Sequence, residues 1–256
     1  MIKFSCKINP LLALVLIVVC PLVANAIKDD AMVIYLSFDE GKGKKVTDES
    51  GKNNHGEIDD KSVKWMDGKV GSALYFDGID DKGTVIVQHS ESMAITKSLT
   101  MEVWVYPQHT ADYRNLRGQE KPHTYYLSIH NAYPSVWLGN AGAGGKEWLP
   151  AKSKVPEKKW SHVAAVYEFN KELRFYLNGK LDGKHTVKGE IPVSNAEHWV
   201  GNRLDGGWAY KGMLDEFVMY NRALTAGEIK QDMERVLSVS KTGKLAVTWG
   251  HVKKEN

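Results

Sequence analysis

The chain has 256 residues, of which 25% are charged, a net charge of +3, 23 glycines, 8 tryptophans and 2 cysteines. A small net charge without a long run of Lys or Arg does not indicate a nucleic-acid partner. Both cysteines, Cys6 and Cys20, lie near the N-terminus. The rest of the chain therefore has no cysteine for a disulfide, a thiolate nucleophile or a thiolate metal site.

Residues 1–26 have the pattern of a secretory signal peptide. An apolar run over residues 11–20 is followed by Ala24-Asn25-Ala26, a small-x-small cleavage pattern, and then by charged Lys28. The alternative is a membrane anchor, but the run is shorter than the roughly 20 residues that a spanning helix needs. We expect a secreted protein, extracellular or periplasmic, with no membrane span after cleavage.

The remaining chain is typical of a single all-β domain over residues 27–237, followed by a Lys-rich extension over 238–256. Short alternating runs are closed by turn residues, which predicts strands at 32–38, 72–76, 84–88, 99–106, 125–130, 135–138, 162–169, 173–177 and 212–220. Asn178-Gly179 predicts a type I′ hairpin turn. Residues 225–237 predict one short helix, with Thr225 as its N-cap and Glu228 completing a capping box.

Several sequence blocks, taken in order, resemble the laminin-G-like jelly rolls of the concanavalin A-like lectin and glucanase superfamily. They are residues 36–41, 46–56, 73–78, 99–105, 160–164, 176–179 and 212–224. The resemblance implies a two-sheet antiparallel jelly-roll sandwich with one short C-terminal helix. It implies sugar binding, protein adhesion or, in some branches, glycan cleavage.

The resemblance also implies a structural calcium ion, for which we name Asp39, Asn53, Asn54 and Asp215 as candidate ligands. Calcium prefers carboxylate, amide and backbone oxygens. The terminal strands of a jelly roll tend to lie side by side, which would bring Asp39 close to Asp215. The alternative is that the Asn and Gly residues are ordinary turn formers and that Asp215 is a capping or paired carboxylate.

Aromatic residues outside the predicted strands are candidates for stacking on sugar rings. We name Tyr113, Trp148, Trp208 and Tyr210 as the carbohydrate-binding candidates. Polar residues that could bond sugar hydroxyls, Asn115 among them, are interleaved with these aromatics. The alternative is that these rings cover the open ends of the sandwich. The tryptophans in or beside predicted strands are assigned to the core, and they are Trp104, Trp137, Trp160 and Trp199.

Catalysis is not indicated by the acidic residues. The related glucanases carry a Glu-x-Asp-x-x-Glu cluster, but the corresponding segment from Glu57 through Asp59 ends in Ser62 rather than in a second glutamate. His162 alternates with apolar residues and is predicted to lie inside the sandwich, and no nucleophile motif accompanies it.

These observations favour a secreted, non-catalytic recognition module that binds a glycan or a glycosylated protein, with calcium stabilising the fold. A protein–protein adhesion or scaffold module is the second hypothesis. A glycoside hydrolase or lyase is the third. The sequence does not indicate an oligomeric state.

Overall fold

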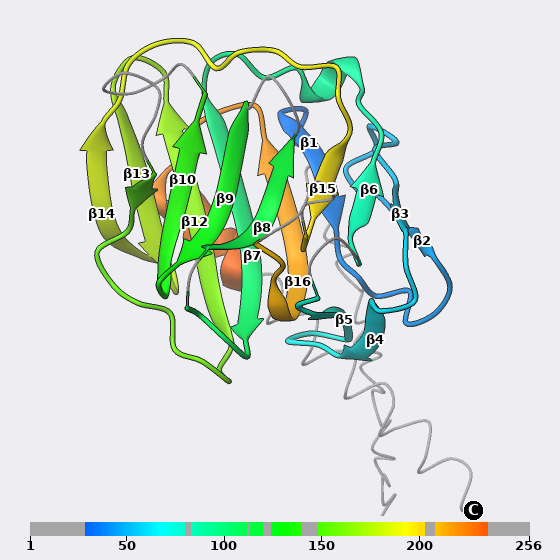
Figure 1. The fold of residues 1–256 in the computed structure, drawn as a ribbon. Helices are drawn as coiled ribbons and strands as arrows, with labels where there is room; N and C mark the ends of the chain where they lie inside the picture. The colour runs from blue at the N-terminus through cyan, green and yellow to red at the C-terminus, as the bar shows by residue number, and fades with distance from the viewer. Residues whose placement is uncertain are drawn as a thin grey trace, which may run out of the picture.

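The computed structural model describes residues 29–79, 83–111, 113–119, 124–139, 148–202 and 208–234. They form a jelly-roll sandwich of two antiparallel sheets with eight strands each (Figure 1). The predicted signal peptide at 1–26 and the predicted extension at 238–256 lie outside the described residues. The predicted all-β fold class is confirmed.

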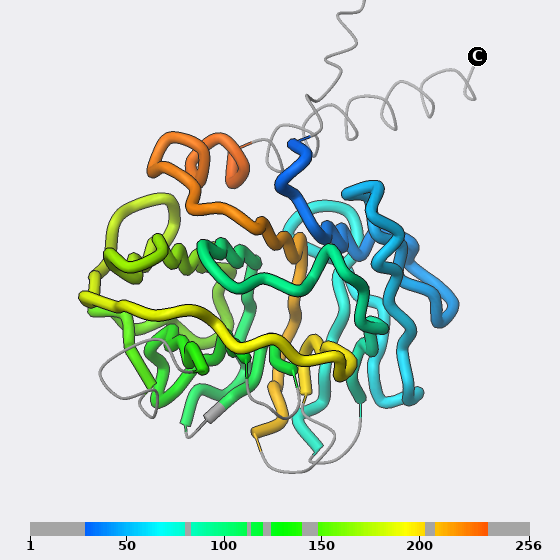
Figure 2. Tube along the Cα trace, turned by 90° about the horizontal axis from the view of Figure 1, so that it is seen from above, coloured from blue at the N-terminus to red at the C-terminus, as the bar shows by residue number. Residues whose placement is uncertain are grey.

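The first sheet, sheet A, contains the first and last strands of the described chain. β16 pairs with β7 on one side and with β5 and β1 on the other, so the first and last strands lie side by side (Figure 2). The order is β14 (Lys180–Thr186), β13 (Glu172–Leu177), β12 (Ser161–Glu168), β7 (Leu99–Pro107), β16 (Lys211–Tyr220), β5 (Ser72–Asp77) and β4 (Lys64–Asp67), with β1 (Met32–Leu36) beside β16.

The second sheet, sheet B, faces sheet A across the core. Its order is β11 (Leu149–Pro150), β10 (Tyr133–Leu138), β9 (Tyr125–His130), β8 (Tyr113–Gln119), β15 (His198–Val200), β6 (Val85–Val87), β3 (Gly56–Ile58) and β2 (Lys45–Val46). A single turn of 3₁₀ helix, η1 (Glu91–Met93), follows β6. Each strand predicted from the sequence is present within a few residues of its predicted ends.

The core lies between the sheets because successive strand residues point to opposite faces. Leu127, Ile129 and Val136 of sheet B pack in one cluster with Val103 and Val163 of sheet A. This single large core stabilises the described domain in the absence of any cysteine beyond residue 20.

The described part of the C-terminal helix covers residues 226–234 and lies on the outer face of sheet A. Thr225 Oγ1 accepts a hydrogen bond from Glu228 N at 3.3 Å, and Glu228 Oε2 accepts one from Thr225 N at 2.8 Å, which confirms the capping box. Ile229 is fully buried in a second cluster with Val166, Tyr176 and Leu224. The helix thus buries an apolar patch that would otherwise face water.

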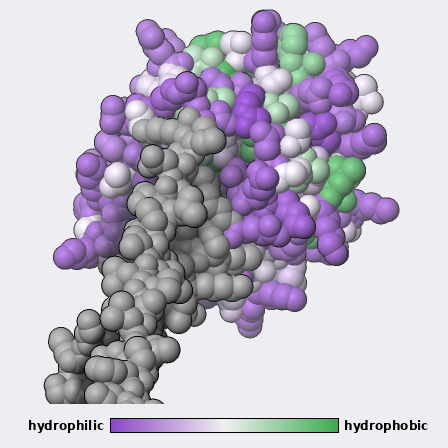
Figure 3. Space-filling view, turned by 180° about the vertical axis from the view of Figure 1, so that it is seen from behind, coloured by the Kyte–Doolittle hydropathy of each residue, from purple (hydrophilic) through white to green (hydrophobic). Residues whose placement is uncertain are grey.

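The surface seen from behind the view of Figure 1 is mainly hydrophilic, with hydrophobic residues in separate spots (Figure 3). Among the described residues, the large hydrophobic side chains that are exposed are Met66, Ile79, Leu181 and Val193. No helix in the described part of the chain is long and apolar enough to cross a membrane.

Candidate functional site

A cluster of aromatic rings lies on the outer face of sheet B. In β9 and β10, Leu127 and Val136 point into the core, so their neighbours Tyr126 and Trp137 point outward. These two outward residues pair directly across the strands. The assignment of Trp137 to the core was therefore wrong. Its position between Val136 and Leu138, which both point into the core, indicates that it faces outward.

Trp148 and Trp208 complete this cluster from segments beside β11 and before β16. The Trp148 ring lies 6.1 Å from Tyr126, 6.0 Å from Trp137 and 6.1 Å from Trp208, measured between ring centroids. The Trp148 and Trp208 rings meet edge to face at 81°. Both rings are only half-buried. The structure thus brings together two of the four residues predicted to bind carbohydrate.

Polar atoms without hydrogen-bond partners lie in the same region. Asn115, in β8, is 1% exposed, and neither its Oδ1 nor its Nδ2 has a hydrogen-bond partner. The buried indole Nε1 of Trp137 also has none. Buried polar groups in proteins are usually paired, so an unpaired set beside half-buried rings is a candidate for ligand contact.

The other two predicted carbohydrate residues are placed differently. Tyr210 is completely buried, stands 6.3 Å from Phe76 between ring centroids, and donates from Oη to Met213 O at 3.2 Å. Its ring is part of the core and is not available to a ligand. The backbone of Tyr113 begins β8, and its side chain lies outside the described residues.

The predicted calcium residues divide between two places. Asn54 is buried; it donates from Nδ2 to Val33 O at 2.6 Å and to Ser92 Oγ at 2.8 Å, and its Oδ1 accepts from Ser90 Oγ at 2.6 Å. Its amide therefore fastens the loop to β1 and η1. Asn53 is exposed with φ of 61°, as expected of a turn residue.

The carboxylate of Asp48 organises the same loop. It accepts hydrogen bonds from Tyr35 N, Ser50 N, Ser50 Oγ and Asn54 N at 2.8 to 2.9 Å. Four donors already surround this carboxylate, and Asn54 is similarly engaged. Hydrogen bonds within the loop and to β1 and η1 therefore engage both of these side chains.

Asp39 and Asp215 do lie close to each other, on either side of the turn between β4 and β5. Asp215 Oδ2 accepts from Lys69 N at 2.8 Å and from Val70 N at 3.1 Å, and Asp39 Oδ1 accepts from Ser72 N at 2.9 Å. Asp215 is fully buried and its Oδ1 has no hydrogen-bond partner. Burial raises the pKa of Asp215 to about 8, and the nearby carboxylates of Glu216 and Asp39 contribute.

These two carboxylates fit only part of a calcium site. Calcium takes about 6 to 8 oxygen ligands. Among the described residues, no three His, Cys, Asp or Glu side chains converge on one point. Asn54 lies by Val33 near the start of β1, whereas Asp39 follows the end of that strand. The predicted four-ligand set is therefore not assembled by the described side chains.

His162 lies on the outer face of sheet A rather than inside the sandwich. Its neighbour Val163 is in the core, and its cross-strand partner Trp104 belongs to the small outer cluster beneath the helix. The prediction that His162 lies within the sandwich was therefore wrong. Glu102 Oε2 lies 3.3 Å from His162 Nε2, yet burial lowers the pKa of His162 to about 4.

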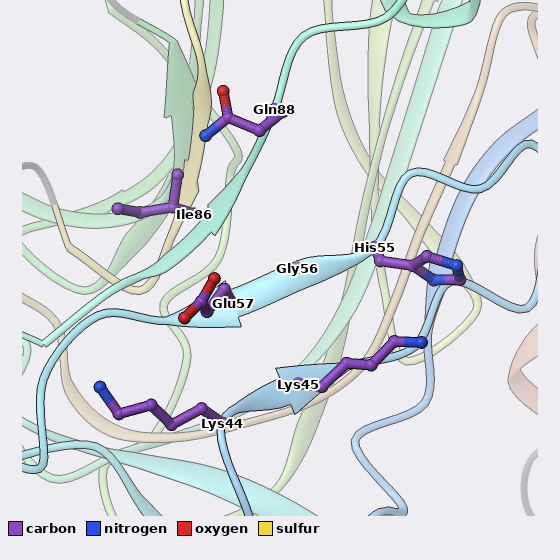
Figure 4. A pocket seen from close by; sticks show the side chains of 7 residues that line it. All are labelled: Lys44, Lys45, His55, Gly56, Glu57, Ile86 and Gln88. Atoms are coloured by element: carbon purple, nitrogen blue, oxygen red, sulfur yellow. The ribbon is translucent and has the colours of Figure 1, made fainter.

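The acidic segment that was compared with glucanase clusters begins in β3, beside the edge strand β2 of sheet B. Glu57 in β3 is exposed beside a hollow of about 530 Å³ (Figure 4). Asp59 and Asp60 accept hydrogen bonds from Thr84 N and Ser62 N, as turn residues do. Glu57 is the one acid among the residues that line the hollow, which are Lys44, Lys45, His55, Gly56, Glu57, Ile86 and Gln88. The lining does not provide the paired acids of a glycosidase.

Comparison with protein families gives a match over residues 74–230 to a family described as the concanavalin A-like lectin/glucanases superfamily. A curated relative, the human adhesion G-protein coupled receptor D1, is 32% identical over 83 residues. That alignment covers 31% of this chain and 10% of the receptor.

Solved structures share the fold at low sequence identity. The binding domain of Paraclostridial Mosquitocidal Protein 1 has a TM-score of 0.66 at 19% identity, covering 80% of this chain and 52% of that one. A second structure is domain 4 of AbnA, a GH43 extracellular arabinanase from Geobacillus stearothermophilus, solved with arabinotriose. It has a TM-score of 0.62 at 20% identity, covering 79% of this chain and 98% of that one. The binding domain of botulinum neurotoxin DC, solved in complex with SialylT, has a TM-score of 0.62 at 16% identity, covering 81% of this chain and 51% of that one. This chain thus spans about half the length of both toxin structures.

Proposed function

The chain belongs to the concanavalin A-like lectin/glucanases superfamily, and from this premise we propose that it is a secreted, non-catalytic recognition module that binds a glycan or a glycosylated partner. The observation that carries the proposal is the contact between Trp148 and Trp208 on the outer face of sheet B. Half-buried rings can stack on the apolar faces of sugars, whereas rings in the core cannot.

Two further observations support binding over catalysis. Two of the similar solved structures are described as binding domains, and a third, domain 4 of an arabinanase, was solved with arabinotriose. In this chain, the segment from Glu57 to Ser62 is a strand end and a turn. A recognition module needs the rings but not a pair of catalytic acids.

The proposal is tested on a glycan array with the full chain and two variants. Trp208→Ala removes a ring of the cluster, and we expect it to weaken binding about tenfold or more, as loss of a central aromatic contact usually does. Trp65→Ala is the matched control, because Trp65 is also a half-buried tryptophan but lies on β4 of sheet A. Wild-type protein that retains no glycan would contradict the proposal.

The adhesion hypothesis predicts a different result in a related experiment. If the loops recognise polypeptide, a captured glycoprotein will remain bound after its glycans are removed enzymatically. If the tryptophan cluster recognises sugar, deglycosylation will release the partner. Release of reducing ends from a polysaccharide would instead favour the hydrolase hypothesis, and its loss in Glu57→Gln would locate the activity.

We also propose a structural calcium ion, now restricted to Asp39 and Asp215. The unpartnered Oδ1 of Asp215 supports this restricted proposal, because a cation could supply the missing interaction. Calcium that binds only the folded state raises its melting temperature. If EGTA leaves the melting temperature of the wild type unchanged, the site is excluded. The site is also excluded if EGTA lowers the melting temperatures of the wild type and of Asp215→Asn by the same amount.

A further inference from the structure

We propose that Asn115, together with the indole N–H of Trp137, forms the polar recognition group of the tryptophan cluster and is kept unpaired for the hydroxyl groups of an uncharged sugar. This inference rests on the proposed function and adds to it a specificity-determining residue and a ligand class. The sequence indicated Asn115 only as one of several polar residues beside the aromatic candidates, and it assigned Trp137 to the core.

The position of Asn115 follows from the sheet. It pairs with Ser128, which alternates with core residues Leu127 and Ile129, so Asn115 lies on the outer face. A strand irregularity between Asn115 and Arg117 brings Asn115 close to Gly118 on the same side. A Cβ at Gly118 would lie 3.4 Å from Asn115 Oδ1 and would collide with the ring of Tyr126. The amide and the Tyr126 ring therefore meet above Gly118.

A series of contacts also links the three rings to the backbone of Asn115. Tyr126 contacts Trp148, and Trp148 contacts Trp208. Trp208 returns to Asn115, since the Asn115 N–H donates to Trp208 O at 2.8 Å. The Asn115 backbone is thereby fixed while its side-chain amide is left without a partner.

Leaving this amide unpaired has a cost in the free protein. A buried polar group without a hydrogen bond is destabilising, and evolution usually pairs or removes such groups. Trp208 adds to this cost, because its φ of 82° is uncommon for a bulky residue. Unpaired groups and unfavourable backbone angles that occur together are typical of binding sites.

The chemistry of the unpaired atoms defines the ligand class. A carboxamide offers an acceptor and two donors, and the indole offers a donor. Sugar hydroxyls both donate and accept, so neighbouring hydroxyls can satisfy this set. Among the described side chains, Asn115, Ser128, Tyr126 and Trp137 carry no charge, so none of these four is a counter-ion for a charged group that loses its hydration on binding. The chemistry of these four side chains therefore favours a neutral saccharide over a sialylated or sulfated one.

Asn115 is 1% exposed, and its amide meets the Tyr126 ring above Gly118. We therefore expect rings of the cluster to move when a ligand reaches the amide. Binding should then change the intrinsic tryptophan fluorescence. Trp148→Phe and Trp208→Phe should each reduce that change.

The decisive variant is Asn115→Leu, which keeps the size of the side chain and removes its unpaired polar atoms. We expect its melting temperature without ligand to rise by about 2–4 °C, because the desolvation cost disappears. We expect its affinity for sugar to fall about tenfold or more. Asn54→Leu is the matched control: Asn54 is equally buried but fully hydrogen-bonded, so this variant should melt at a lower temperature.

Calorimetry with the full chain measures binding to neutral cellotriose, arabinotriose and lactose, and to acidic sialyllactose and trigalacturonic acid. Binding to a neutral sugar that Asn115→Leu abolishes and Trp137→Phe weakens supports the inference. A lower melting temperature for Asn115→Leu, or unchanged sugar binding by it, overturns the inference and leaves the proposed function intact. Binding to acidic sugars alone overturns the ligand class. Wild-type protein that binds no sugar overturns the proposed function and this inference with it.

Discussion

At the scale of single residues, Gly118 allows the ring cluster to form on sheet B. A side chain at this position would collide with the ring of Tyr126. We expect Gly118→Ala to destabilise the protein by about 1–3 kcal/mol, the usual cost of overpacking. Denaturant titration measures this as a lower midpoint with an unchanged slope.

The control for Gly118→Ala is the same substitution at a position with space. Gly227 is exposed near the start of the helix, and its added Cβ would meet only Thr225 Oγ1, at an ordinary 3.8 Å. Gly227→Ala should stabilise the protein by about 0.5–1 kcal/mol, because alanine has the higher helix propensity. Equal effects of the two substitutions would contradict the steric argument for Gly118.

The same scale shows what local sequence could predict about the site. Trp148 and Trp208 were selected because they lie between predicted strands, and the structure brings them together. Tyr210 met the same criterion, but it is buried against Phe76, a residue far away in sequence. Asn115 was not distinguished from the other polar residues near these aromatics, because nothing in the local sequence marks an amide as unpaired; only the three-dimensional neighbours of an atom decide that.

At the scale of elements, the chain is predictable where its residues alternate or where a turn or cap has a clear motif. Asn178 and Gly179 have φ of 51° and 74°, as the predicted hairpin turn requires. Strand β8 was missed because Asn115, Arg117 and Gly118 interrupt its apolar pattern. Most of β14 was missed because it is a polar edge strand, and polar edges protect sheets against aggregation.

The helix over residues 226–234 gives a prediction at this scale, because packing rather than propensity holds a helix this short. Ile229 is completely buried against sheet A, so Ile229→Ala should cost about 2–4 kcal/mol. Lys230→Ala, on the exposed side, should change stability by no more than about 0.5 kcal/mol. Denaturant unfolding of both variants checks this, and a small loss for Ile229→Ala would show that the helix is not firmly docked.

At the scale of the whole molecule, the two outer faces of the sandwich serve different purposes. The outer face of sheet A is covered by the helix and contains buried ionisable groups, including Glu102, His162 and Asp215. The outer face of sheet B has the half-buried rings and the unpaired amide. Above pH 6.5, stability should therefore depend on pH mainly through Asp215 of sheet A; at lower pH, His162 of sheet A and His198 of sheet B, whose pKa burial also lowers, contribute as well. Binding of a neutral ligand at the outer face of sheet B should depend on pH only weakly.

The pH dependence of sheet A can be predicted from Asp215. Its folded pKa is about 8, whereas an unperturbed aspartate has a pKa of 3.8. Between these values the folded state holds a proton that the unfolded state has released, so stability decreases as pH rises through this window, by up to about 1.4 kcal/mol per pH unit. His162 has the opposite effect below its ordinary pKa of 6.5, because the folded state keeps it neutral down to about 4.

Measurements between pH 6.5 and 8 therefore isolate Asp215 from His162. Chemical unfolding of the calcium-free wild type should show stability falling across this range. Asp215→Asn cannot ionise, so its stability should stay nearly constant there and should exceed that of the wild type at pH 8. Added calcium should flatten the wild-type profile if the ion binds the ionised Asp215, because a bound cation favours the charged carboxylate. A wild-type profile that is flat without calcium would show that Asp215 is ionised in the folded protein, and the unpartnered Oδ1 would then need another partner.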